Sequence, residues 1–252
     1  MTISEIIQRA SLGGLNDRFL LRINPDSTTI QAKSNANSFQ SIVLGPSFLS
    51  EESKEDGIEV EVDIINAGDL EKLVALVPDS LVTPVYEFGS QVRDLIFDTE
   101  EKRVRFTIGG SLELDEKSFS SSSGTPLMLP MCVNGSTIEA LKKAASALKT
   151  SDITIYVNED NVLIGRVGHS DSNYFEMELS DDEVAWSDLS KQNGMTSYIS
   201  TFNAKPLFAA NKFNKKGEYE FHIYRNQAHV VISQDDDDEI VFQADYLLTK
   251  IR

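Results

Sequence analysis

The chain has 252 residues, of which 40 are Asp or Glu and 23 are Lys or Arg, and its formal net charge is -17. This length suits one large domain or two modest ones, and a hydrophobic content of 40% excludes a fully disordered chain. A single cysteine, Cys132, excludes an intrachain disulfide and a cysteine-rich zinc site. We expect a soluble cytoplasmic protein without membrane contact, because no segment is apolar enough to cross a bilayer and the first ten residues do not resemble a signal peptide.

Four segments carry the residues that usually begin a helix. They start at Thr2, Asn66, Ser136 and Asn203. Thr2 and Ser136 each precede a glutamate by three residues, which is the capping-box pattern, and the two asparagines are good N-cap residues. Apolar residues then recur at helical spacing, so each segment predicts a helix with one buried face. The four starts lie 64, 70 and 67 residues apart, close to a quarter of the chain.

Segments of alternating apolar and polar residues follow the helices and end in turn residues. The clearest are 153–157, 162–167, 174–179, 219–223 and 240–246. Such alternation is typical of antiparallel strands with one buried face and one wet face. The sequence therefore predicts an α+β fold built from repeated units of a helix and a meander of strands.

The text DEKSFSSSSGTP, residues 115–126, interrupts this pattern near the middle of the chain. A run of serines with glycine and proline reads as a connector. We predict an N-terminal domain over 1–118, a linker over 119–126 and a C-terminal domain over 127–252, each domain with two helices packed on antiparallel sheets. On spacing alone, a true internal repeat and two plain α+β domains of similar design both remain open.

Lysines concentrate on the predicted helices of the second half. Residues 137–150 have a net charge of +2 and residues 203–216 a net charge of +4, whereas the acids lie in strands and turns, as in the run 235–239. This clustering has two interpretations. The simple one is that lysines are common on solvated helix faces. The second is that the lysines form a surface that contacts the phosphate backbone of nucleic acid, where lysine acts as a point charge without reading the base sequence.

No pattern in the sequence indicates catalysis. The three histidines, His169, His222 and His229, lack the spacing of metal ligands, and no phosphate-binding loop, dinucleotide fingerprint or nucleophile elbow is present. The acidic run also lacks the glycine and the terminal glutamate of a calcium loop. We predict no catalytic residue, no metal, no cofactor and no enzymatic activity.

Two long segments resemble a known family. The segment TPLMLPMCVNGSTIEALKKAASALKTSDITIYVNEDNVLIGRVGHSDSNYFEMEL is similar to the start of the second domain of the T-even-type bacteriophage sliding clamp, and GEYEFHIYRNQAHVVISQDDDDEIVFQADYLL is similar to its closing meander. IINAGDLEKLVALV and VRDLIFDTEEKRVRFTI fall where the family has its second helix and the next hairpin. The resemblance rests on the order of elements, since clamps carry no short diagnostic motif.

The resemblance implies a DNA polymerase processivity factor in the cytoplasm of a phage-infected host cell. Three copies of a two-domain chain would complete a six-domain ring around double-stranded DNA, with sheets outside and helices inside. It implies as partners a DNA polymerase, a clamp loader and two further copies of the chain, with a role in late transcription in some phage members.

The resemblance also implies which residues act. The residues implied to contact DNA are Arg9, Lys142, Lys143, Lys149, Lys205, Lys212, Lys215 and Lys216. Sheet edges near 111–115 and 173–179 would join neighbouring subunits through Ser111, Leu112, Leu114, Tyr174, Phe175 and Met177. Residues 1–118 carry 11 basic and 21 acidic residues, a net charge of -10, so positive charge in the channel would come mainly from the second domain.

A different class of protein accounts for the same composition. An acidic structural or assembly protein, such as a virion component that does not bind DNA, also fits the charge and the lack of catalytic patterns. An enzyme with an unrecognised site is the third alternative.

Overall fold

The computed structural model describes residues 1–33, 39–87, 91–109, 124–169, 171–215, 217–236 and 239–251. The chain forms two compact units: unit 1 comprises 1–119 and 234–244, and unit 2 comprises 120–233 and 245–252. Residues 234–244, the end of one strand and the start of the next, thus group with unit 1. Because most of the predicted linker 119–126 lies outside the described residues, the predicted domain boundaries stay predictions.

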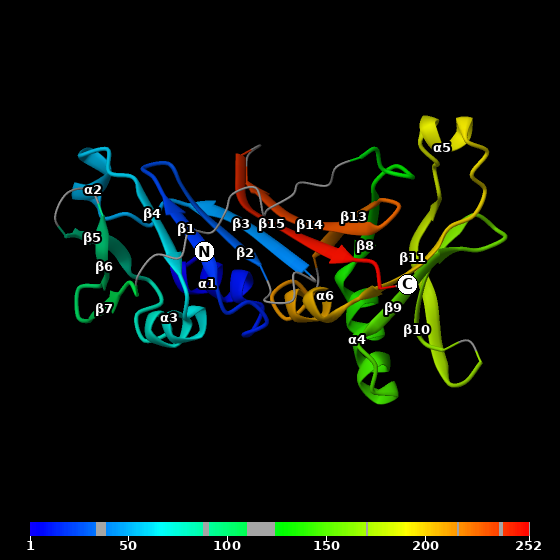
Figure 1. Ribbon diagram of the computed structural model, residues 1–252, viewed down its shortest axis with the longest axis horizontal. Helices are drawn as coiled ribbons and strands as arrows, with labels where there is room; N and C mark the ends of the chain where they lie inside the picture. Colours follow the sequence, from blue (N-terminus) through cyan, green and yellow to red (C-terminus); the bar gives the residue numbers. More distant parts are fainter. Residues whose placement is uncertain are drawn as a thin grey trace. The chain divides into compact units, whose positions relative to one another are not determined.

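Unit 1 places helices against two antiparallel sheets. Its elements are α1 (Ile3–Ser11), β1 (Phe19–Ile23), β2 (Ser27–Lys33), β3 (Phe39–Pro46), α2 (Glu51–Glu55), β4 (Val60–Ile64), α3 (Ala67–Val74), β5 (Leu81–Tyr86), β6 (Val92–Asp98) and β7 (Arg103–Thr107). One sheet has the order β4-β1-β2-β3 and the other has the order β5-β6-β7. Helix α1 packs on β2 and β3 of the first sheet and lies beside α3, which contacts β7 of the second sheet (Figure 1).

Unit 2 has the same arrangement. Its elements are β8 (Met131–Asn134), α4 (Gly135–Leu148), β9 (Asp152–Val157), β10 (Val162–Gly168), β11 (Tyr174–Glu183), α5 (Asp188–Gln192), β12 (Ile199–Asn203), α6 (Lys205–Ala210), β13 (Glu218–Ile223), and the parts of β14 (Gln227–Asp236) and β15 (Glu239–Thr249) that lie outside 234–244. One sheet has the order β11-β10-β9-β12, and β14, β13 and β8 are neighbours in the other. The order β12-β9-β10-β11 matches β4-β1-β2-β3 strand for strand.

These units confirm the predicted α+β fold of a few helices on antiparallel sheets. They also share a short sequence repeat that periodicity and charge did not reveal. Ser50 and Ser187 are the N-caps of α2 and α5, and each side chain accepts a hydrogen bond from the backbone N–H of a serine three residues later. The texts SEESKEDG and SDLSKQNG, 137 residues apart, both end in a glycine with φ of 65°. The arrangement of helices and strands therefore repeats once, after about half of the chain.

The four predicted helices form within two residues of their predicted starts. Thr2 caps α1 with the complete capping box that its sequence predicts. The capping box predicted at Ser136 is wrong, because α4 begins at Gly135 after Asn134 and no side chain caps it. Asn66 precedes α3 as predicted but makes no cap hydrogen bond. The N-cap predicted at Asn203 is wrong, because Ala204 is the N-cap of α6, although the Asn203 side chain accepts a hydrogen bond from the Lys205 N–H.

The predicted apolar faces of the helices make up much of the core. Ile3, Ile6 and Ile7 of α1 are fully buried. In α4, Ile138 and Leu141 are fully buried against β10 and β11. Burying a side chain of this size contributes roughly 1.5–3 kcal/mol, so these stripes hold the helices on their sheets. The opposite faces of the helices are left to solvent.

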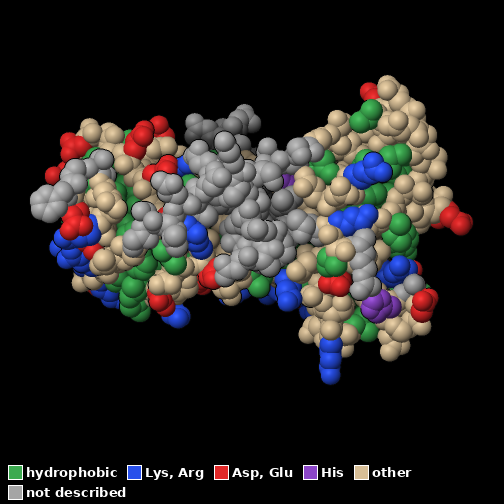
Figure 2. Space-filling model, viewed as in Figure 1, with side chains coloured by type: hydrophobic (Ala, Val, Ile, Leu, Met, Phe, Trp, Pro, Cys, Tyr) green, Lys and Arg blue, Asp and Glu red, His purple; other side chains and the backbone are tan. Residues whose placement is uncertain are grey.

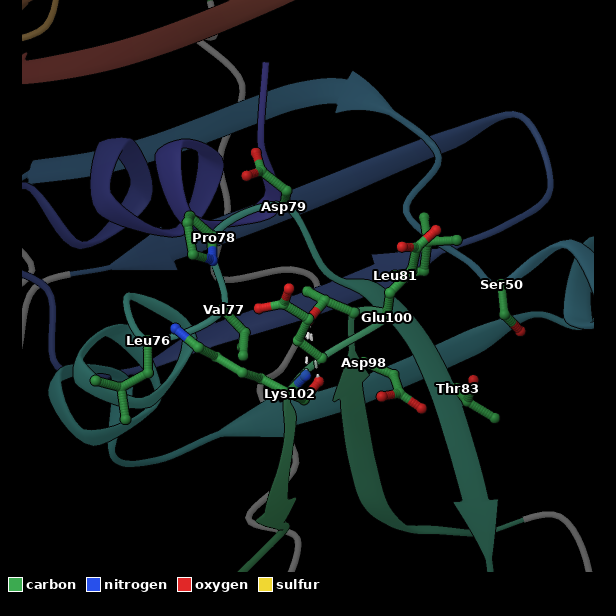
Figure 3. Close-up of a pocket in the computed structure, with 12 residues that line it drawn as sticks. Ser50, Leu76, Val77, Pro78, Asp79, Leu81, Thr83, Asp98, Glu100 and Lys102 are labelled. Carbon is green, nitrogen blue, oxygen red and sulfur yellow. Dashed lines mark hydrogen bonds between the residues drawn. The ribbon is translucent and has the colours of Figure 1, made fainter.

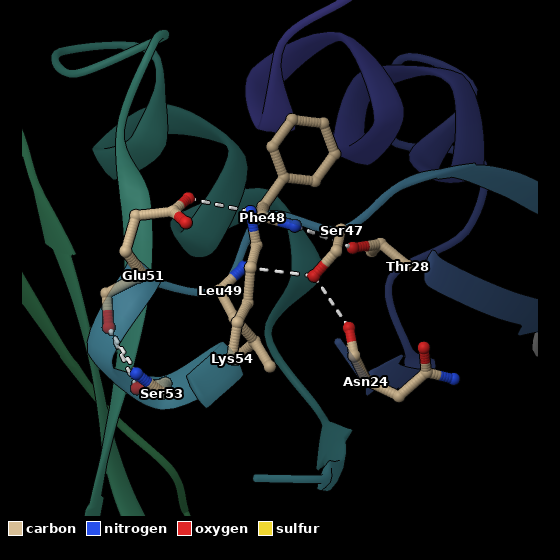
Figure 4. A network of polar contacts seen from close by, with 9 residues as sticks. Asn24, Thr28, Ser47, Phe48, Leu49, Glu51, Ser53 and Lys54 are labelled. Carbon is tan, nitrogen blue, oxygen red and sulfur yellow. Dashed lines mark hydrogen bonds and ion pairs between the residues drawn. The ribbon is translucent and has the colours of Figure 1, made fainter. Parts of the chain in front are cut away.

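A polar network fixes the chain between β3 and α2. The Ser47 hydroxyl donates to the Asn24 carbonyl at 2.6 Å, and the Phe48 N–H donates to the Thr28 hydroxyl at 3.3 Å (Figure 4). The Lys54 ammonium pairs with the Glu51 carboxylate at 2.9 Å on α2. Beyond the end of β3, side chains thus provide hydrogen-bond partners for backbone groups that have no partner in a neighbouring strand.

Candidate nucleic-acid interface

Helices α4 and α6 of unit 2 are in contact and form one surface. Asn211, at the end of α6, is fully buried and donates from Nδ2 to the Gly135 carbonyl at 2.9 Å. The same Nδ2 lies 3.3 Å from the hydroxyl of Tyr219, and that hydroxyl donates to the Asn214 carbonyl at 3.0 Å. The turn that follows α6 is therefore anchored on the first residue of α4.

Gly135 makes this close approach possible. A Cβ atom at this position would lie 2.6 Å from the carbonyl oxygens of both Asn214 and Lys215. The Gly135 N–H also donates to the Gly217 carbonyl at 2.8 Å. The glycine therefore brings the lysine-bearing turn after α6 against the start of α4.

The predicted DNA-contacting lysines of unit 2 lie on this surface. The exposed ones are Lys143, Lys149, Lys205, Lys212 and Lys215; Lys142 is half-buried, and Lys216 lies outside the described residues. At 1.5 Å per residue, Lys142 and Lys149 are about 10 Å apart along α4. Basic side chains project beside α6 and at the lower end of α4, whereas acidic ones gather near α2 (Figure 2).

Two local contacts modify these charges. The exposed Lys143 ammonium lies 3.8 Å from the carboxylate of the half-buried Glu139 one turn earlier, a long and therefore weak ion pair. The Lys212 ammonium sits 5.4 Å from the centre of the Phe213 ring. Within the described part of α4 with its C-cap Lys149, α6 and the turn after α6, Glu139 is the single acid beside six lysines. The surface is therefore cationic on a strongly acidic chain.

The matching helices of unit 1 are different. Arg9 lies half-buried in the last turn of α1. On α3, Lys72 pairs with Asp69 at 3.5 Å, and the Glu71 carboxylate accepts a 2.6 Å hydrogen bond from the Ser11 hydroxyl of α1. The surface of α1 and α3 thus lacks the excess of cations found on α4 and α6, in line with the acidic first half of the sequence.

Three of the predicted subunit contacts, Tyr174, Phe175 and Met177, lie on the edge strand β11 of unit 2. Ser111, Leu112 and Leu114 lie outside the described residues. Tyr174 and Phe175 are 48% and 39% exposed, and Met177 is half-buried. Tyr174 packs against the Arg166 guanidinium, whose central carbon is 5.8 Å from the centre of the ring. Large apolar side chains are therefore accessible along this edge.

Cys132 is an exposed residue of β8. Partial desolvation, together with the nearby carboxylates of Glu218, Glu220 and Asp182, raises the pKa of its thiol and disfavours the reactive thiolate. No group of three or more His, Cys, Asp or Glu side chains among the described residues could hold a metal ion. No helix in the described part of the chain is long and apolar enough to span a membrane.

No protein-family model and no curated protein matches the sequence. The fold, however, matches solved structures over nearly the whole chain. Proliferating Cellular Nuclear Antigen from Entamoeba histolytica superposes with a TM-score of 0.68 at 10% identity, covering 99% of this chain and 94% of that one. PCNA from A. fulgidus, solved with the C-terminal region of FEN-1 bound, has a TM-score of 0.63 at 12% identity, covering 100% and 97%.

The chain has the fold of a sliding clamp. The H. pylori Beta clamp also matches, with a TM-score of 0.67 at 10% identity, and the match covers 99% of this chain and 64% of that chain. At such identities the likeness concerns the fold and carries over no residue roles. It confirms the predicted clamp architecture, whereas the T-even-type relationship stays a prediction.

Sequence reasoning missed the residues that position the cationic surface. Asn211 and Gly135 carry no charge and belong to no motif, and their role depends on contacts between segments 76 residues apart. The sequence offers one signal, which is that Asn211 directly follows the apolar run 207–210. The lysines themselves were found because their charge is visible in the sequence.

Proposed function

We propose that this chain is a DNA sliding clamp that encircles double-stranded DNA and tethers a replicative polymerase. The observation that carries the proposal is the cationic surface of α4 and α6 on a clamp-like fold of net charge -17. Lysines attract phosphates at any sequence, which suits a protein that must move along the duplex. The acidic remainder of the chain disfavours DNA elsewhere.

The proposal includes an assembly. Three copies, each contributing two units, would close a ring through sheet edges, with β11 as one of them. An exposed strand edge is otherwise prone to uncontrolled pairing, so an interface would use and protect it. A clamp loader would open this ring. A. fulgidus PCNA binds the C-terminal region of FEN-1, and we extend this kind of attachment, through a terminal region of the partner, to the partners of this chain. The resemblance to T-even-type clamps adds a proposed role in phage late transcription.

The charge of the α4/α6 surface can be tested directly. We expect the double variant Lys143→Glu/Lys212→Glu to weaken binding to a 30-base-pair duplex. The dependence of log K on log salt should also flatten, by about 0.9 for each phosphate that the variant no longer neutralises. Fluorescence anisotropy at several salt concentrations measures both effects, and primer extension measures processivity.

Lys54→Glu/Lys191→Glu is the matched control, since these exposed or half-exposed lysines lie on α2 and α5 and the net charge changes equally. Equally weakened binding in both variants would show that only total charge matters and would overturn the proposal.

Retention of the protein on nicked circular DNA, with release when the DNA is cut to a linear form, tests encirclement separately.

A further inference from the structure

Unit 1 contains a hollow that none of the residues proposed to contact DNA lines. Its volume is about 780 Å³, which is within the range of ligand sites. Three segments surround it: residues 76–79 after α3, the start of β5, and the turn between β6 and β7 (Figure 3). It shares no residue with the α4/α6 surface, so its role can be tested independently of DNA binding.

The walls of the hollow are preformed. Leu81 of β5 lies opposite Asp98 of β6 in the sheet register. The Thr99 N–H donates to the Lys102 carbonyl at 2.9 Å, and the Lys102 N–H donates back to the Thr99 hydroxyl at 3.0 Å. This closed turn holds the residues between them at the rim. A partner would therefore meet a surface that needs little ordering.

The floor of the hollow is apolar and accessible. Leu76 is 60% exposed and Leu81 is 38% exposed, and Pro78 is exposed beside them. Figure 3 shows Leu76 after the helix and Leu81 at the start of the strand, on opposite sides of the hollow. Apolar side chains gathered in a concave site gain more from a partner than single exposed leucines do.

The rim of the hollow is acidic. Four carboxylates line it, from Asp79, Asp98, Glu100 and Glu101, against one cation, Lys102. Asp98 is paired with the Arg103 guanidinium. Asp79, Glu100 and Glu101 make no ion pair with another described residue, so their charge is available to a partner. This field repels DNA and disfavours a second copy of a chain with net charge -17.

We propose that this hollow binds a short segment of a partner protein in which large apolar side chains alternate with lysine or arginine. The apolar side chains contact Leu76 and Leu81, and the cations contact Glu100, Glu101 and Asp79. Complementary charge makes the site specific for a basic partner and speeds association, and contact with the apolar floor strengthens binding. The site would give unit 1 a role in recruitment while unit 2 contacts DNA.

The test uses a labelled eight-residue peptide of alternating lysine and leucine, with a glutamate–leucine peptide of the same length for comparison. We expect the full-length protein to bind the lysine peptide at least tenfold more tightly, and more weakly as salt rises. Glu100→Gln/Glu101→Gln and Leu76→Ser/Leu81→Ser should each weaken binding fivefold or more in fluorescence anisotropy. Lys102→Gln should strengthen it.

Matched controls keep the result specific. Glu52→Gln/Glu55→Gln removes two exposed carboxylates of α2, and Leu189→Ser removes an exposed leucine of α5; neither should change binding by more than twofold. Equal binding of the two peptides, or equally weakened binding in the control variants, would overturn the proposal. The glutamate variants lie on an exposed turn, so they remain informative if the leucine variant does not fold.

Discussion

At the scale of single residues, Asp94 shows how the fold of unit 1 uses charge. Its carboxylate is 1% exposed and accepts hydrogen bonds from Arg93 Nε and from the Thr107 hydroxyl, both at 2.7 Å, with Arg105 as a third donor. The hydrogen bond from Arg105 is the largest cause that holds the pKa of this carboxyl well below its usual range, and those from Thr107 and Arg93 add to it. A buried charge is tolerated here because its oxygens are satisfied.

This lowered pKa makes the stability of the protein depend on pH in a defined direction. A carboxylate whose pKa is lower in the folded state stabilises the fold above its ordinary pKa of about 4 and loses that contribution as pH falls further. We expect Asp94→Asn to lower the thermal midpoint at pH 7 and to make the decline between pH 5 and pH 2 shallower.

Thermal unfolding followed by circular dichroism at several pH values measures both effects. Asp98→Asn is the comparison, because Asp98 and Arg103 form a more exposed pair across the same two strands, and solvent-exposed ion pairs contribute little to stability. Parallel pH profiles for the Asp94→Asn variant and the unchanged protein would contradict this role of Asp94.

At the scale of elements, contacts at the ends of the helices decide where the cationic side chains lie. The start of α4 touches the turn after α6 through Gly135, where no side chain fits. Gly68, near the start of α3, has no atom within 4 Å of an added Cβ. The two glycines therefore occupy similar helical positions in different surroundings.

We expect Gly135→Ala to destabilise the protein by about 1–3 kcal/mol, because the added methyl displaces the backbone of residues 214–215. Gly68→Ala should instead stabilise it by about 0.4–1 kcal/mol, because alanine restricts the unfolded chain and nothing blocks the methyl. Urea unfolding of both variants measures the change in the free energy of unfolding, which should be opposite in sign for the two. A gain in stability for Gly135→Ala would show that the turn moves freely and does not position Lys212 and Lys215.

At the scale of the whole molecule, the two units share a topology and differ in charge. The α4/α6 surface of unit 2 carries the cations, and unit 1 carries much of the acid. In a ring of three chains, cationic and acidic units would alternate, so DNA would meet three strongly positive surfaces. The exposed edge of β11 is the described part of the contact that we propose between copies.

Ring formation predicts a mass near three times 28.0 kDa in light scattering. We expect Phe175→Glu to shift the protein toward monomer, because a carboxylate on β11 would be buried against the neighbouring copy without a partner. Ile199→Glu is the control: Ile199 is 63% exposed on β12, at the other edge of the same sheet. A wild-type monomer at micromolar concentration, or equal effects of both variants, would count against the ring.

The kinds of element, the apolar faces and the places where lysines gather could all be predicted from the sequence, because capping residues, periodicity and charge are local properties. Residues 153–157 and 162–167 form strands, and Ile3, Ile6 and Ile7 are buried, as their spacing predicts. The half-chain repeat of α2 and α5 was not predicted, because these helices are shorter than two turns and show little periodicity.

The way these elements meet became visible in the folded chain alone. The burial of Asn211, the need for glycine at position 135 and the hollow above Leu76 and Leu81 all arise from segments distant in sequence. Packing between such segments depends on shape in three dimensions, and no local pattern encodes it. The charge of -17 is a property of the sequence, whereas its separation into a cationic helical surface and an acidic hollow is a property of the fold.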